Sequence, residues 1–250
     1  MKKWEASWIW VNEELRRNNQ YMEARGSFEL RTSPERAVLR VTANQEYELY
    51  VNGEEIGRGP SPCDNGSQYY DVYEIADKLR PGRNVVGVLA YNFGTDSIVT
   101  GQRQGPGGLL CQVDLKPDAG VDESVCLAAT GEGWKCRVSP RWRPDSIRMH
   151  MWGGYREIYL AEREDGWELP EYDDSDWSAA TVVAVANGEE SPWPKLLERE
   201  IPHLKQAWLR PVDLVGEQAY LGAIVNAGSV LEGADPSGSM SVDASVPGSY

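Results

Sequence analysis

The most regular pattern of apolar and polar residues lies between residues 47 and 94. Apolar residues alternate with polar ones from 47 to 51, and this period of two predicts a half-buried β-strand. Asn52-Gly53 follows and supplies the two positive φ angles of a tight hairpin turn. The return strand ends before Pro60, because proline has no N–H to donate to a β-ladder. The pattern therefore predicts an antiparallel hairpin.

Short apolar runs bounded by Gly, Pro, Asn, Asp and Ser recur along the chain, as is typical of strands. Further strands are expected at residues 4–12, 27–31, 37–42, 70–73, 85–91, 109–115, 125–128, 147–152, 157–161, 181–186 and 204–215. Residues 13–24 are polar with room for one helical turn, and 134–144 are expected to pack irregularly on the outside. This succession predicts an all-β fold, an antiparallel β-sandwich of the galactose-binding-like or jelly-roll kind with long loops.

Composition changes along the chain suggest how it is organised. Residues 4–205 are expected to form the sandwich, with a Pro- and Glu-rich linker at 187–202. Residues 206–250 are expected to hold the end of a last strand and a Gly/Ser-rich tail, or the start of a following domain.

The chain has ten Trp and twelve Tyr but only two Phe. Such rings fill cores and also stack on sugars, so their number alone does not reveal a ligand.

The charge of the chain excludes two classes of partner. The formal net charge is −14, whereas binding to nucleic acid or to an anionic membrane surface requires a basic face. No apolar stretch has the length of a signal peptide or a transmembrane helix, so a cytoplasmic location is expected.

Cysteines 63, 111, 126 and 136 form no Cys-x-x-Cys pair, and the chain has two histidines. Free thiols are therefore expected, and a zinc site is not.

Six segments resemble, in the same order, the N-terminal sandwich of bacterial α-L-rhamnosidase-type enzymes, glycoside hydrolase family 78. They are WIW from residue 8, LYVNGEEIGRGP from 49, YYDVYEI from 69, LRPGRNVVGVLAYNFG from 79, GWELPEYDDSDWSAA from 166 and PWPKLLEREIPHL from 192. The resemblance implies a parent enzyme that hydrolyses terminal α-L-rhamnose from glycosides. In that family paired carboxylates act in a helical (α/α)6 barrel far C-terminal of this sandwich, in keeping with the general chemistry of glycosidases.

This chain shows no sustained helical periodicity, so no catalytic residue is carried over from the family. The expected function is a non-catalytic accessory region that binds a rhamnose-containing carbohydrate or docks a C-terminal catalytic domain or subunit. The alternative is a purely structural sandwich that packs on a barrel or subunit and binds no sugar. In that case the Trp-rich segments 134–142 and 192–194 would be interface anchors, since Trp is enriched at interface centres.

The best candidate binding residues lie in the loop 61–69. Asp64, Asn65 and Tyr69 offer a carboxylate, an amide and an aromatic face, which suit sugar hydroxyls and a sugar ring. Asn92, which follows the strand 85–91, is a further sugar-binding candidate. The resemblance implies that Asp64 and Asn65 hold a calcium ion, for which oxygen ligands are appropriate. The alternative is a solvated loop that turns at Asn65-Gly66.

The densest acidic cluster is Asp173-Asp174-Ser175-x-Trp177. Its expected structure is an Asx turn, in which carboxylates accept hydrogen bonds from backbone N–H groups and Trp177 anchors the turn. A catalytic or metal-binding role is the less favoured alternative.

Overall fold

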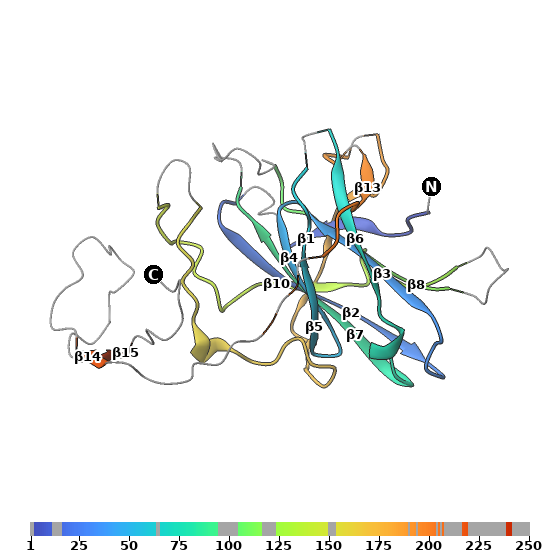
Figure 1. Ribbon diagram of the computed structural model, residues 1–250, viewed down its shortest axis with the longest axis horizontal. Coiled ribbons are helices and arrows are strands. Elements are labelled where there is room, and N and C mark those ends of the chain that lie inside the picture. The colour runs from blue at the N-terminus through green and yellow to red at the C-terminus, as the bar shows by residue number, and fades with distance from the viewer. Residues whose placement is uncertain are drawn as a thin grey trace. The chain divides into compact units, whose positions relative to one another are not determined.

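The computed structural model describes residues 3–11, 17–63, 66–94, 105–116, 124–149, 154–189, 191–193, 195–203, 205, 207, 217–219 and 239–241. The chain divides into two units, Met1–Glu200 and Ile201–Tyr250. The first unit is a two-layer β-sandwich (Figure 1), as the sequence predicts. In the second unit, β14 (Glu217–Ala219) pairs with β15 (Ser239–Ser241) in antiparallel fashion.

One layer is a seven-stranded sheet with the order β12-β1-β8-β3-β6-β13, and β9 also pairs with β8. Its strands are β1 (Ser7–Trp10), β3 (Ala37–Ala43), β6 (Gln68–Glu74), β8 (Leu109–Leu115), β9 (Val125–Ala129), β12 (Thr181–Val185) and β13 (Leu196–Glu198). Neighbours are antiparallel except β13 and β6, which are parallel.

The other layer is a six-stranded antiparallel sheet with the order β11-β10-β2-β7-β4-β5. Its strands are β2 (Gln20–Leu30), β4 (Glu46–Val51), β5 (Glu54–Gly59), β7 (Gly82–Asn92), β10 (Lys135–Val138) and β11 (Ser178–Ala179). Two 3-10 turns, η1 (Ala76–Lys78) and η2 (Ala161–Arg163), lie in connections.

The core lies between the two sheets, where alternate residues of each strand meet. Leu39 and Val41 of one sheet and Val86 and Val88 of the other are fully buried in one apolar cluster. Each such side chain contributes about 1.5–3 kcal/mol to folding through burial. The alternation in the sequence therefore reports which face of each strand turns inward.

Several sequence predictions are confirmed. The predicted hairpin is β4 and β5, joined at Asn52 (φ 52°) and Gly53 (φ 85°). The predicted strands at 37–42, 109–115, 125–128 and 181–186 correspond to β3, β8, β9 and β12. The four cysteines are free thiols.

Other predictions are wrong. Residues 20–30 form the single strand β2 instead of a polar stretch followed by a short strand, because β2 carries charged residues that the fold buries. Trp134 does not lie on the outside; it is buried in the core, against Gly26. Residues 135–138 form β10, and part of the expected linker forms β13. The expected strands around 147–161 contain only isolated bridges in their described part.

Candidate functional site

The outer face of the seven-stranded sheet is covered by the N-terminal segment. The backbone N–H groups of Glu5 and Ala6 donate to Oε1 of Gln112 at 2.7 and 3.2 Å. The guanidinium of Arg40 lies 4.2 Å from the centre of the Trp4 ring and donates to Asp114 at 2.7 Å. Because these side chains are used within the fold, this face offers little room for a ligand.

The outer face of the six-stranded sheet is covered by residues 139–149 and 154–177, here called the cover segment. Trp167 and Trp177 of this segment are buried with Leu89 of β7, and Trp142 stacks on Tyr21 of β2 at 4.7 Å. Aromatic stacking and burial thus hold an irregular segment against a regular sheet.

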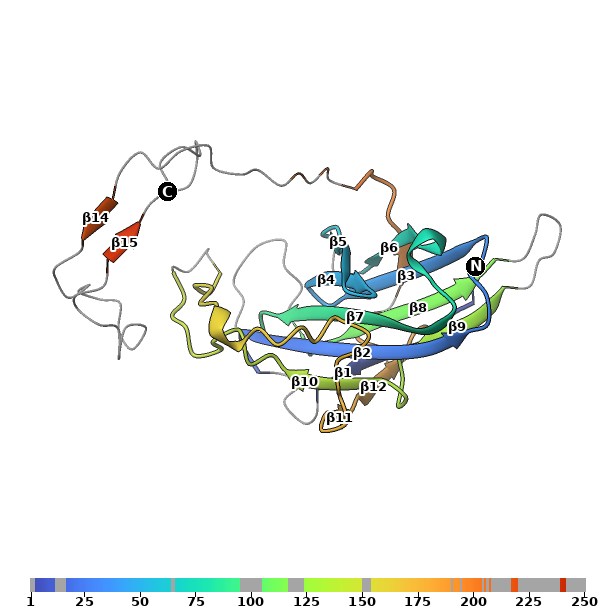
Figure 2. The same cartoon turned by 90° about the horizontal axis from the view of Figure 1, so that it is seen from below.

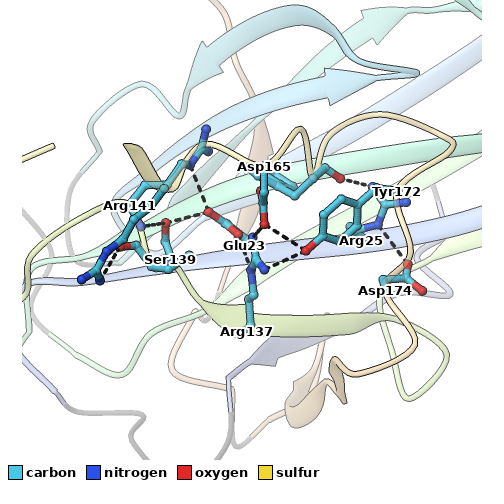
Figure 3. A network of polar contacts seen from close by, with 11 residues as sticks. Glu23, Arg25, Arg137, Ser139, Arg141, Asp165, Tyr172 and Asp174 are labelled. Carbon is cyan, nitrogen blue, oxygen red and sulfur yellow. Dashed lines mark hydrogen bonds and ion pairs between the residues drawn. The ribbon is translucent and has the colours of Figure 1, made fainter. Parts of the chain in front are cut away.

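A polar network beneath the cover segment contains the most deeply buried carboxylate of this face (Figure 3). Glu23 of β2 is fully buried and accepts hydrogen bonds from Arg137 Nε at 2.6 Å, Ser139 Oγ at 2.6 Å and Arg141 Nε at 3.2 Å. Burial is the strongest influence and leaves the pKa of Glu23 above its ordinary value, although the hydrogen bond from Ser139 and the charges of the two arginines lower it. Its two oxygen atoms are thus held by three hydrogen bonds from β10 and from the residues that follow it.

The network extends outward through two further carboxylates. Arg137 also donates to Asp165 at 2.6 Å, and Arg25 donates to Asp174 at 2.9 Å. Burial alone would raise the pKa of both aspartates, but their hydrogen bonds to these guanidinium groups hold it below the usual value. Each carboxylate thus has a cationic partner. The arrangement fastens the cover segment to β2 and β10.

The acidic cluster at residues 173–177 forms the turn that the sequence predicts. Ser175 N–H donates to Asp173 Oδ1 at 3.0 Å, which is an Asx turn, and Trp177 is buried. Asp174 additionally pairs with Lys135 at 3.1 Å. The structure therefore confirms the structural interpretation of this motif.

One end of the sandwich gathers five buried side chains that are here called the rim cluster: Asn44, Gln45, Gln68, Asn92 and Trp193. Asn44 Nδ2 donates to Asn92 Oδ1 at 3.1 Å, and Trp193 Nε1 donates to Asn44 Oδ1 at 2.9 Å. Phe93 N–H donates to Gln45, and Gln68 Nε2 donates to the Ala43 carbonyl at 2.7 Å. The cluster therefore connects the ends of β3, β6 and β7.

Close approach of an indole to the backbone shapes the rim cluster. Trp193 stacks on Trp8 with ring centres 3.9 Å apart. A Cβ atom at Gly108 would lie 2.3 Å from the Trp193 ring, so only glycine allows the indole to reach this position. Gly108, just before β8, thus serves this packing.

Two of the predicted site residues, Tyr69 and Asn92, fall at the same end. Tyr69 is half-buried in β6, next to Gln68, and its carbonyl accepts a hydrogen bond from Thr42 at 2.7 Å. Asn92 is fully buried, and its Nδ2 atom has no hydrogen-bond partner among the described residues. Asp64 and Asn65 lie outside the described residues. Cys63 Sγ donates to the Ser67 carbonyl at 2.8 Å across the base of their loop.

The sequence did not indicate Asn44 or Gln45 as members of this cluster, whereas Gln68 lies in the predicted binding loop 61–69. A weak signal for these two was present, because both are polar residues next to the end of an apolar strand. The Glu23 network was also missed, since its members come from distant parts of the chain.

The two residues that the resemblance implies as calcium ligands, Asp64 and Asn65, are not among the described residues. Asn44 Oδ1 and Asn92 Oδ1 already accept hydrogen bonds within the rim cluster. Among the described residues, no group of three His, Cys, Asp or Glu side chains could hold a metal ion. Within the same residues, no helix has the length and hydropathy needed to cross a bilayer.

The fold and the polar end define an all-β sandwich with both outer faces covered and a loop-bearing rim. The chain belongs to the α-L-rhamnosidase N-terminal domain family, whose family model matches residues 32–195. The solved GH78 family rhamnosidase of Bacillus sp. GL1 is similar at 36% identity with a TM-score of 0.74, over 88% of this chain and 22% of that one.

Two other proteins are also similar. An α-L-rhamnosidase of Streptomyces avermitilis is 26% identical over 195 residues, which are 76% of this chain and 15% of that protein. A lectin from Pleurotus ostreatus, solved with GalNAc, has the same fold at 19% identity and a TM-score of 0.51, over 79% of this chain and 48% of the lectin. The chain thus spans less than a quarter of the length of the two rhamnosidases.

Proposed function

We propose that this chain is the non-catalytic accessory region of an α-L-rhamnosidase-like glycoside hydrolase, and that its rim binds a rhamnose-containing carbohydrate. The parent enzyme would hydrolyse terminal α-L-rhamnose in a C-terminal catalytic domain or in a separate catalytic chain. The single observation that carries the proposal is the match of the family model to residues 32–195. Reduced thiols at all four cysteines favour a cytoplasmic location.

The loop 61–69 at the rim, rather than a sheet face, is the proposed binding surface. The rim cluster is buried and hydrogen-bonded within the fold, so direct contacts with a sugar would come from this loop. Both outer faces are occupied by the chain itself, through Trp4 and Arg40 on one sheet and through the cover segment on the other. The loop that holds Asp64 and Asn65 leads directly into Gln68 and Tyr69, beside Asn92. A calcium ion, if the rim takes one, would need ligands from Asp64 and Asn65.

The second candidate function is a sandwich that only packs on a catalytic barrel or subunit. The Trp-rich segments predicted as its anchors offer little support for it, because Trp134 and Trp193 are buried within the sandwich. Trp142, which is half-buried, stacks on Tyr21 of the same fold. An exposed anchor would have to come from other residues.

L-rhamnose is expected to bind weakly, with a dissociation constant on the order of 0.1–1 mM, and Asp64→Ala is expected to abolish this binding. A carboxylate accepts two sugar hydroxyls at once, which alanine cannot do. The measurement is calorimetric titration with L-rhamnose, with and without calcium, beside galactose and glucose. Asp77→Ala is the matched control, because Asp77 is exposed in η1 and lies in the β6–β7 connection. Unchanged binding by Asp64→Ala would contradict the site, and no heat with any sugar would favour the packing role.

The pure 250-residue chain is expected not to hydrolyse an aryl α-L-rhamnoside. The carboxylates of the Glu23 network are paired with arginines, which leaves them unsuited to protonate a leaving group. The assay is release of the aryl group over several hours, with a complete rhamnosidase as positive control. Turnover that one carboxylate substitution removes would overturn the non-catalytic assignment.

A further inference from the structure

Three asparagines of the chain are followed directly by glycine, at residues 52–53, 65–66 and 187–188. An asparagine before glycine can react with its own main chain, because glycine has no Cβ to keep the next backbone nitrogen away from the side-chain amide carbon. Asn65 lies outside the described residues. The surroundings of the reacting amide can therefore be compared for Asn52 and Asn187.

The side chain of Asn52 is fixed by hydrogen bonds on both of its polar atoms. Its Nδ2 atom donates to the Lys78 carbonyl at 2.8 Å and to Asn84 Oδ1 at 2.9 Å. Its Oδ1 atom accepts from the Val85 N–H at 2.9 Å. These three bonds must break before the amide can turn toward the nitrogen of Gly53, so the fold protects Asn52.

Asn187 has the opposite surroundings. It is exposed in the turn that follows β12, and its side-chain amide has no hydrogen-bond partner among the described residues. The N–H of Gly188 makes one hydrogen bond, to the Val185 carbonyl at 3.1 Å. A single exposed bond at the end of an edge strand opens more easily than the bonds inside a sheet. The Asn187 amide and the Gly188 nitrogen are therefore able to meet in the folded chain.

We propose that Asn187 is a site of spontaneous deamidation, and that the isoaspartate formed there loosens the packing of Trp193. The backbone nitrogen of Gly188 gives up its proton and bonds to Cγ of Asn187, and the side-chain nitrogen leaves with that proton as ammonia. Water then opens the resulting succinimide ring at either carbonyl, which yields aspartate or isoaspartate. Water is the only co-reactant, and the modification does not depend on sugar binding.

The effect on Trp193 follows from where the turn lies. Figure 2 shows β12 and β6 on opposite sides of the sandwich, and β13 pairs with β6, so the chain crosses from one edge of the sheet to the other between β12 and β13. On this path Ser191 N–H donates to the Gly188 carbonyl at 3.0 Å, and Trp193 N–H donates to Ser191 Oγ at 3.2 Å. Isoaspartate at position 187 adds one carbon atom to the main chain directly before these bonds, which displaces the Gly188 carbonyl.

The test is incubation of the folded chain at physiological temperature, at neutral and at mildly alkaline pH, followed by tryptic peptide mapping with mass spectrometry. Trypsin places the three Asn-Gly pairs on separate peptides, since it cuts after Arg40, Arg58, Lys78, Arg163 and Lys195. The peptide of Asn187 is expected to change from amide to acid at least about tenfold faster than that of Asn52, whose hydrogen bonds must first break. The rate is expected to rise with pH, because the Gly188 nitrogen has to lose its proton.

Two variants separate the reaction from other changes in the peptide. Asn187→Gln is expected to abolish the mass change, because the longer side chain has to close a larger ring. Gly188→Ala keeps the amide and is expected to slow the reaction several-fold. The added Cβ would lie 3.3 Å from Val185 Cγ2, and Gly188 does not have a positive φ, so the fold tolerates alanine there.

In urea, where the fold is lost, the peptides of Asn52 and Asn187 are expected to react at similar rates. A folded chain in which Asn187 stays unmodified, or in which Asn52 reacts as fast, would overturn the proposal, as would the same difference in rate persisting in urea. The second readout is denaturant unfolding followed by tryptophan fluorescence. Aged wild type that contains isoaspartate is expected to unfold at lower denaturant than equally aged Asn187→Gln, and equal midpoints would overturn the effect on Trp193.

Discussion

Replacing Glu23 with alanine is expected to lower the free energy of unfolding by about 3–5 kcal/mol, because removing one member of a buried ion-paired group leaves its partners uncompensated. Arg141 and Arg137 would lose the carboxylate that they share, and Ser139 Oγ its acceptor. The cover segment would then lose a main polar attachment to β2, and the aromatic layer under it would open to water.

Denaturant unfolding followed by circular dichroism and tryptophan fluorescence measures this loss. Glu29→Ala is the matched control, because Glu29 is exposed on the same strand, and it is expected to change stability by less than about 0.5 kcal/mol. Glu23→Gln keeps an oxygen acceptor and should be less damaging than alanine. If Glu23→Ala lowered the free energy of unfolding by less than about 1 kcal/mol, the expectation would be contradicted. The cost of burying the Glu23 charge would then nearly equal the stabilisation from its ion pairs.

Replacing Trp193 with alanine is expected to cost about 3–5 kcal/mol, as for other fully buried large side chains. The indole stacks on Trp8 and donates to Asn44 at 2.9 Å. Its loss would leave a cavity beside Gly108 and remove the partner that orients Asn44 toward Asn92. This substitution is therefore expected to lower the stability of the sandwich and to disturb the positions of the rim side chains.

Thermal and denaturant unfolding of Trp193→Ala and Trp193→Phe measure this effect. Phenylalanine retains part of the stacking and loses the N–H donor, so a smaller loss of about 1–2 kcal/mol is expected. If both variants lost the same stability, the hydrogen bond to Asn44 rather than the packing would carry the contribution. Rhamnose titration of Trp193→Phe would then show whether the orientation of Asn44 matters for binding.

Local rules explain the parts of the fold that could be predicted. Asn52-Gly53 forms the expected turn because both residues adopt positive φ angles. The strand β8 has the predicted bounds because its apolar residues face a core on one side. The Asx turn at Asp173 needs only residues two positions apart, so it too follows from the local sequence.

The Glu23 network and the rim cluster could not be predicted, because their members are distant in sequence. Glu23 and Arg25 make the sequence of β2 resemble a polar segment. In the folded chain both are buried because distant residues pair with them. These partners are Arg137 and Arg141 for Glu23, and Asp174 for Arg25. Trp134 was misplaced for the same reason, since its burial depends on Gly26 in another strand. Local periodicity carries no information on such pairings.

The sequence by itself determined the all-β class, the central hairpin, most strand positions and the resemblance to α-L-rhamnosidases, since alternation and turn residues act over a few positions. Only the tertiary structure decided which charges are buried together and that both sheet faces are covered. Those features depend on contacts between segments more than a hundred residues apart, such as Trp193 with Asn44. Burial and pairing of charges are settled by packing, and packing is a property of the whole sandwich.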